Sequence, residues 1–150
     1  MSALFAFLHH LAAFVLFATL FVELVLIKGE LTAWSARKIL RLDLVYGIAA
    51  TTVVIIGFLR VTQFEKGAHY YFHSIPFLVK IATFALVGLV SIYPTRQYMR
   101  WRAVLKRGEV PVIDASLRRR IASLVHLQLT GLVIILLCAA LMARGVGYFG

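Results

Sequence analysis

Residues 3–27 read ALFAFLHHLAAFVLFATLFVELVLI, and this stretch decides the fold. It is apolar except for His9, His10, Thr19 and Glu23. A helix needs about 20 apolar residues to cross the hydrocarbon core of a bilayer, so the stretch is long enough to span a membrane. Ionisable side chains at membrane depth are costly and mark functional sites, so we expect Glu23 to face protein and not lipid.

The helical period divides this stretch into two faces, because positions 3, 4, 7 and 11 residues apart share one side of a helix. The face that contains the acid consists of His9, Ala13, Leu16, Leu20, Glu23 and Ile27. His9 is therefore predicted to be the interior histidine, and His10 is the alternative candidate. The neighbouring face carries Phe7, His10, Phe14, Phe17 and Phe21 and is expected to meet lipid or a partner chain.

Three further apolar runs follow, at residues 42–59, 75–93 and 121–142. The composition is 62% hydrophobic and 15% charged, whereas soluble domains carry about 25% charged residues. Together these features predict an all-α integral membrane protein, a four-helix bundle formed by one domain of 150 residues. The N-terminus lacks the basic region of a cleavable signal peptide, so we expect the first segment to remain.

Capping residues and small residues add local detail. Thr32 or Ser35 is suited to cap a short surface helix in the first connection, and Asp114 or Ser116 is suited to cap the last span.

In the second span, small side chains favour close helix contact, which predicts a packing face. That face would consist of Gly47, Ala50, Val54 and Gly57.

The distribution of charge predicts the orientation in the membrane. Four spans place both termini on one side, where Arg60, Lys66 and Arg144 are the basic residues. The connections 28–41 and 94–120, on the other side, carry four and eight Lys or Arg residues. The positive-inside rule places these two connections in the cytoplasm and both termini on the outer side of a bacterial inner membrane. The net charge of +10 is thus explained by anionic lipid heads, and nucleic-acid binding is not indicated.

This topology sorts the polar residues of the spans into two layers. His9 lies about 9 Å and Lys80 about 8 Å below the outer ends of their helices, at 1.5 Å per residue. Glu23 and His126 lie at matching depth near the inner side. An inner cluster of Glu23 with His126, or with an arginine of the first connection, would satisfy the buried acid.

The outer layer suggests a b-type haem, because histidines that project into a bundle core are the usual axial ligands of haem iron. His9 would be the axial ligand, with His10 as the reserve. Lys80 would be a second ligand, for which it must be deprotonated, or a contact to the propionates. In the alternative interpretation, Lys80 extends to the outer headgroups and His9 hydrogen-bonds across the bundle.

The segment FLHHLAAF at residues 7–14, with the four-run layout and the run around Lys80, resembles an uncharacterised family of small four-helix bacterial membrane proteins, a domain of unknown function. That resemblance spans nearly the whole chain and implies no activity. More distantly, the chain is similar to the HemJ-type protoporphyrinogen oxidases. In those enzymes a histidine early in the first helix precedes an aromatic-Ala-Gly-Leu-aromatic stretch, and a lysine lies early in the third helix in a Leu-x-Val-Lys context.

Here LFATLF at residues 16–21 and FLVK at residues 77–80 occupy these places, so the resemblance implies haem contacts at His9 and Lys80. The chain departs from that pattern at Thr19 and Glu23, because the HemJ-type first helix is rich in Gly and Trp.

Three functions are open at this point. The first is a haem-dependent membrane oxidoreductase that uses a quinone or a porphyrin. The second is a non-enzymatic assembly or stress protein, as a monomer or a homo-oligomer. The third is a small oligomeric transporter or proton path through Glu23, His126 and Lys80, although the sequence has no pair of Gly/Pro-broken helices of the transporter kind. Soluble-type hydrolase and nucleotide chemistry are not indicated, because the sequence has no nucleophile motif, phosphate-binding loop or zinc motif.

Overall fold

The apolar runs form four long helices in the computed structural model, which describes residues 2–64 and 68–150. Each helix is long and apolar enough to cross a membrane, which confirms the predicted all-α architecture. The helices are α1 (Ser2–Lys28), α2 (Ala33–Leu59), α4 (Ile75–Lys106) and α5 (Ala115–Ala143). A π-helical turn, η1 (Arg60–Phe64), and the short helix α3 (Ala68–Phe72) lie between α2 and α4. Lys66, which entered the charge count, lies outside the described residues.

The caps set where two of these helices begin. Thr32 forms a capping box, in which its Oγ1 accepts a hydrogen bond from the Ser35 amide at 3.1 Å and its own amide donates to Ser35 Oγ at 2.8 Å. The surface helix expected in the first connection is therefore the first part of α2 and not a separate element. Asp114 caps α5 by accepting a hydrogen bond from the Leu117 amide at 2.7 Å.

Helix α4 continues well past the apolar run at 75–93, so the prediction that a connection begins at residue 94 is wrong. A proline inside a helix removes one hydrogen bond and strains the preceding turn. Pro94 is tolerated here because the turns after it bury Tyr98 and Trp101, whose rings lie 5.1 Å apart. Burial of two large aromatic side chains offsets the local cost. The true connection is therefore short and spans residues 107–114.

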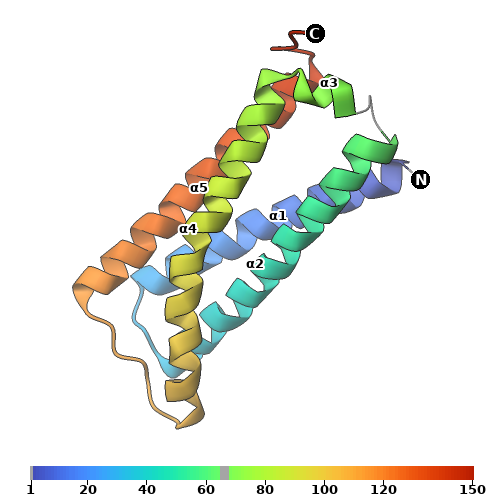
Figure 1. The fold of residues 1–150 in the computed structure, drawn as a ribbon. Helices are drawn as coiled ribbons and strands as arrows, with labels where there is room; N and C mark the ends of the chain where they lie inside the picture. Colours follow the sequence, from blue (N-terminus) through green and yellow to red (C-terminus); the bar gives the residue numbers. More distant parts are fainter. Residues whose placement is uncertain (1, 65–67) are drawn as a thin grey trace.

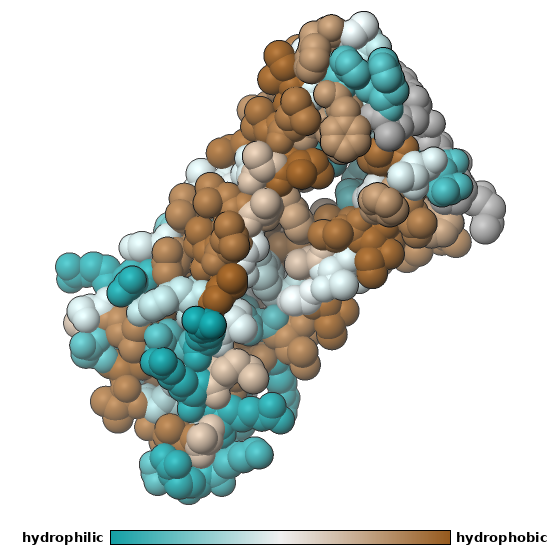
Figure 2. Space-filling model, in the orientation of Figure 1, coloured by the Kyte–Doolittle hydropathy of each residue, from teal (hydrophilic) through white to brown (hydrophobic). Residues whose placement is uncertain are grey.

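The helices form two antiparallel pairs (Figure 1), α1 with α2 and α4 with α5. Both chain termini lie at one end of the bundle, here called the terminal end, and the connections 29–32 and 107–114 lie at the other, the connection end (Figure 1). The two pairs approach each other at the connection end and diverge toward the terminal end. Figure 2 shows the surface hollowed between the diverging arms, and we call this hollow the terminal opening.

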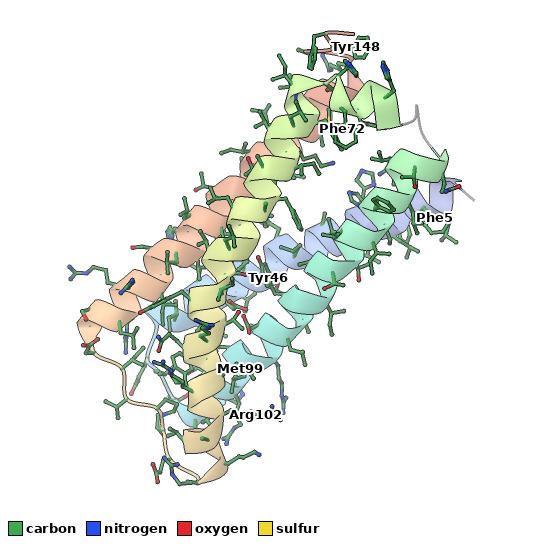
Figure 3. All side chains as sticks on the ribbon, viewed as in Figure 1. Phe5, Tyr46, Phe72, Met99, Arg102 and Tyr148 are labelled. Carbon is green, nitrogen blue, oxygen red and sulfur yellow. The ribbon has the colours of Figure 1, made fainter. Side chains whose placement is uncertain are left out.

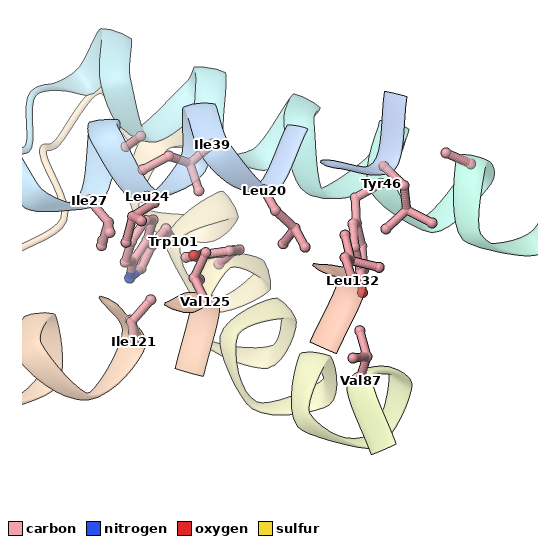
Figure 4. Close-up of a cluster of buried hydrophobic side chains, with 14 residues drawn as sticks. Leu20, Leu24, Ile27, Ile39, Tyr46, Val87, Trp101, Ile121, Val125 and Leu132 are labelled. Atoms are coloured by element: carbon pink, nitrogen blue, oxygen red, sulfur yellow. The ribbon is translucent and has the colours of Figure 1, made fainter. Parts of the chain in front are cut away.

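The tightly packed core lies in the connection half of the bundle. The largest fully buried side chains lie there, and most are apolar: Leu20, Ile27, Ile39, Tyr98, Ile121, Val125, Glu23 and Gln128. Figure 4 shows the apolar part of this core, with Leu20, Ile27, Ile39, Ile121 and Val125 among its labelled side chains. The predicted inward face of α1 is confirmed at Leu16, Leu20, Glu23 and Ile27, all of which are buried. The predicted outward face is confirmed for Phe7, Phe14 and Phe21, which are exposed, but it is wrong for Phe17, which is partly buried and packs against the core.

The predicted small-residue packing face of α2 is wrong in part. Gly47 and Val54 are exposed, and α2 instead buries the larger residues Ile39, Tyr46 and Ile56. The reason is that bulky side chains fill the wide space between the pairs, whereas small residues are needed only where backbones approach closely. That close approach occurs between α4 and α5, where a Cβ added at Gly131 would overlap the Val87 side chain.

Gly131→Ala is expected to lower the free energy of unfolding by about 1–3 kcal/mol, the usual cost of overpacking. The β-branched side chain of Val87 has little rotamer freedom in a helix, so it cannot move aside easily. Gly47→Ala is the matched control, because a Cβ there meets nothing within 4 Å, and it is expected to be neutral or stabilising by up to about 1 kcal/mol. Denaturant unfolding in mild detergent, followed by circular dichroism, measures both. Equal effects of the two substitutions would contradict this packing.

Candidate functional site

His9 lies on α1 with its ring directed at α2. The ring rests against a glycine, because a Cβ added at Gly57 would be 3.3 Å from His9 Cε1. The imidazole reaches the backbone carbonyl of Val53. His9 Nδ1 is buried and has no hydrogen-bond partner within the described part of the chain. His10 is exposed, and its Nδ1 lies 2.6 Å from the Ala6 carbonyl oxygen of its own helix, so His9 is the interior histidine of the pair.

Two basic side chains lie near His9. Lys80 on α4 and Arg60 at the start of η1 are close enough for their charges to act on the imidazole. Both are half-buried, and each also makes another contact within the chain. Basic groups from three different elements therefore gather at the terminal opening, and His9 and Lys80 share one layer of the bundle.

The C-terminal residues brace the terminal end of the α4/α5 pair. The Ile75 amide donates a hydrogen bond to the Gly147 carbonyl at 3.0 Å, and the Phe149 amide donates to the His73 carbonyl at 3.0 Å. Figure 3 shows Phe72 and Tyr148 at this end, and the Phe72 ring packs against Phe77 with the centroids 5.7 Å apart. No sequence pattern predicts this bracing, because the paired groups are backbone atoms far apart in the chain.

The second polar layer surrounds Glu23 in the connection half. Glu23 is 2% exposed, and the charged group that acts on it is Asp43 of α2. Asp43 accepts a hydrogen bond from Thr95 Oγ1 of α4 at 2.7 Å. Tyr98 of α4 is close enough to both carboxyl groups to interact with them. Tyr46 of α2 also interacts with both acids.

The predicted pairing of Glu23 with His126 is wrong. His126 is exposed, and its Nε2 lies 3.3 Å from Lys28 Nζ. The helical period explains this, because α5 buries Val125 and Gln128 and therefore turns His126 away from the core. The arginines of the first connection do not serve Glu23 either, because Arg37 and Arg41 are exposed.

Sequence reasoning missed Tyr98 and Thr95 as members of the inner layer. Both follow Pro94, and the sequence pattern predicts a connection there, for which no buried helical face is expected. The signal that identifies them is the amphipathic period of residues 94–106, in which Pro94, Tyr98 and Trp101 recur on one side.

The comparison with protein families gives a match over residues 1–147, to the family described as "Predicted membrane protein (DUF2214)". The chain belongs to this family. Membership in DUF2214 confirms the resemblance to small four-helix membrane proteins and agrees with the four candidate spans. The comparisons with curated proteins and with solved structures gave no match. They bring no support for the more distant similarity to HemJ-type oxidases, and family membership identifies this DUF2214 chain as a membrane protein.

The donor chemistry of the two layers differs. Within the described residues, no group of three or more His, Cys, Asp or Glu side chains is placed to hold a metal ion. A haem needs fewer ligands from the protein, because the porphyrin supplies four nitrogen ligands and one or two side chains complete the coordination of the iron. The outer layer offers an imidazole and two cations, which suits a metal complex that carries carboxylates. The inner layer offers carboxyl and hydroxyl groups.

Proposed function

We propose that this chain is a membrane protein that binds a b-type haem at the terminal opening and takes part in electron transfer. The observation that carries the proposal is the state of His9, which reaches the Val53 carbonyl while its Nδ1 is buried without a partner among the described residues. A metal-ligating histidine typically hydrogen-bonds a carbonyl through one ring nitrogen and binds the metal through the other.

The residues around the opening fit such a group. His9 would be the axial ligand and would bind the iron through its unpartnered Nδ1. Lys80 and Arg60 are two cations beside it, and a haem carries two propionates, so we assign both cations to the propionates. When bound, the haem supplies one-electron redox chemistry. A quinone or a porphyrin, both soluble in lipid, is the proposed electron partner.

A spectral titration tests the proposal. Haem is added to the protein purified in mild detergent, and the visible spectrum is recorded in the oxidised and reduced states. We expect a shifted Soret band that saturates at equimolar haem, with sharp reduced α and β bands. A spectrum that remains that of free haem in detergent would overturn the proposal and favour a non-enzymatic assembly or stress protein.

Lys80 variants separate its two assigned roles. If Lys80 pairs with a propionate, Lys80→Arg keeps the spectrum and the affinity, because the charge remains. Lys80→Glu then weakens haem binding by about 10- to 100-fold, since each tenfold change corresponds to about 1.4 kcal/mol. Haem titrations of both variants measure these effects. A Lys80→Arg protein whose reduced bands move would instead make Lys80 the second axial ligand.

We also infer that the connection end faces the cytoplasm. It gathers exposed basic residues (Figure 2), among them Arg37, Lys38, Arg41, Arg100, Arg102, Lys106, Arg107, Arg119 and Arg120. Cysteine labelling tests the orientation in a Cys138→Ala background. An impermeant thiol reagent is expected to label Phe149→Cys in the intact inner membrane from outside. It should label Val112→Cys, at a position 96% exposed in the second connection, only after permeabilisation. The reverse pattern would invert the topology.

A further inference from the structure

The inner polar cluster, which we define as Glu23, Asp43, Tyr46, Thr95 and Tyr98, has no part in the proposed haem site. Its members come from α1, α2 and α4 and meet in the most tightly packed part of the bundle. Glu23 and Tyr98 are 2% and 0% exposed. Polar groups so deeply buried in an apolar bundle are expensive, and at membrane depth they are functional by default.

Two of these side chains present polar atoms that no described residue satisfies. Glu23 Oε1 and the Tyr98 hydroxyl are both buried without a hydrogen-bond partner in the described part of the chain. The hydroxyl is also close enough to the carboxyl groups of Glu23 and Asp43 to interact with both. An unpartnered hydroxyl beside two acids provides a donor and an acceptor for a mobile proton.

The charges around Glu23 indicate what the cluster holds. From α2 it is faced by Asp43 and Tyr46, and from α4 by Tyr98. From α5 the buried polar side chain at this depth is Gln128, which is uncharged. The basic residue one turn beyond Glu23 on α1, Lys28, lies instead beside His126 at the surface. Two ionised carboxylates without a cation would be prohibitively costly in such a site, so the cluster must take up positive charge.

The surroundings of the cluster permit exchange with water on one side. Asp43 is half-buried, and its neighbour Arg41 is exposed at the connection end. On the terminal side the cluster is closed by the apolar side chains of Leu20, Val87 and Leu132 (Figure 4) and by that of Leu16, all less than 9% exposed. A charge can therefore reach Glu23 through Asp43, but not through this apolar layer.

We propose that Glu23 is a proton-binding site that is loaded from the connection end through Asp43, with Tyr98 as the neighbouring hydroxyl. A proton from water at the connection end passes to the Asp43 carboxylate and then to the Glu23 carboxylate, which becomes a neutral carboxylic acid. The reverse path returns the proton to the same side. This store of one proton inside the membrane does not depend on haem binding at the other end.

Infrared spectroscopy tests the proposal on the whole protein in lipid. We expect a carboxylic-acid C=O band at neutral pH in the wild type and in the control Glu30→Gln, which changes an exposed glutamate. The band should be absent from Glu23→Gln and shifted in frequency in Tyr98→Phe. If Glu23→Gln does not fold, wild-type protein with ¹³C-labelled glutamate carboxyl groups assigns the band to glutamate, because the band then moves with the label. Glu23 is the buried glutamate among the described residues, since Glu30 and Glu109 are exposed. A wild type without a labelled acid band would overturn the proposal.

The route is tested by hydrogen–deuterium exchange of the same band. Asp43→Asn should slow the exchange by about a hundredfold, which is within the range for loss of a positioned proton-transfer group. Unchanged exchange would overturn the path through Asp43. A thermal unfolding measurement with added sodium or potassium ions tests the alternative that the site binds a metal cation. If either ion stabilises the wild type but not Glu23→Gln, the site is a metal-cation site and the proton assignment is overturned.

Discussion

Replacing Trp101 by alanine is expected to lower the free energy of unfolding by about 3–5 kcal/mol, the range for truncating a buried tryptophan. Trp101 is 5% exposed and packs on Tyr98, with the ring centroids 5.1 Å apart. It also lies in the buried cluster that joins all four long helices, near Ile27, Ile39 and Ile121 (Figure 4). Its removal leaves a cavity where the two helix pairs are held together, so the loss should be large.

Trp34, the other tryptophan of the chain, is the matched control. It is 59% exposed, and its main contact is Lys38 Nζ, which lies 4.7 Å from the ring centroid. Such an exposed cation–π contact contributes about 0.5–1 kcal/mol, so Trp34→Ala should cost no more than that. Denaturant unfolding in detergent compares the two variants. Similar losses would show that the connection end is not the structural centre of the bundle.

His9→Ala is expected to remove the Soret band of bound haem, while His10→Ala leaves it in place. The two residues are neighbours in sequence, but only His9 faces α2 with an unpartnered buried nitrogen, and His10 is exposed. His9 is half-buried, so its truncation should leave the fold intact, and the helical circular dichroism of each variant verifies this. Retention of the haem spectrum in His9→Ala would remove His9 as the axial ligand, and loss in His10→Ala alone would assign the ligand to His10.

The two proposed sites lie in different halves of the bundle. The connection half is filled by large side chains from all four helices and holds the inner polar cluster in a fixed surrounding. The terminal half is held open, because the helix pairs diverge (Figure 1) and the C-terminal residues brace the α4/α5 pair. A ligand that enters the opening therefore meets His9, Lys80 and Arg60 without disturbing the packed half.

Much of the fold follows from the sequence where one physical signal dominates. In α1 the apolar length and the position of Glu23 are sufficient to predict the buried residues Leu16, Leu20 and Ile27 and the exposed residues Phe7, Phe14 and Phe21, although not the partial burial of Phe17. The sequence also predicts a cap at Thr32 or Ser35 and another at Asp114 or Ser116, and the structure places these caps at Thr32 and Asp114.

Other features were missed where two signals compete. Pro94 and the arginines after it resemble a connection, yet the aromatic residues Tyr98 and Trp101 continue the helix because their burial outweighs the proline. The prediction that His126 lies in the core rests on its depth alone, and depth does not determine the direction of a side chain. The inner polar cluster therefore has a different composition from the predicted one: Asp43 and two tyrosines, and no histidine, surround Glu23.

The haem content of the protein as isolated from the membrane tests the central claim most directly. The chain is expressed in cells supplied with haem and purified in mild detergent, and its haem b is quantified against protein while the oxidised and reduced spectra are recorded. We predict haem b approaching an equimolar amount, with sharp reduced bands that His9→Ala abolishes. A folded, colourless protein that gains no Soret shift on addition of haem would contradict it and leave the terminal opening without this ligand.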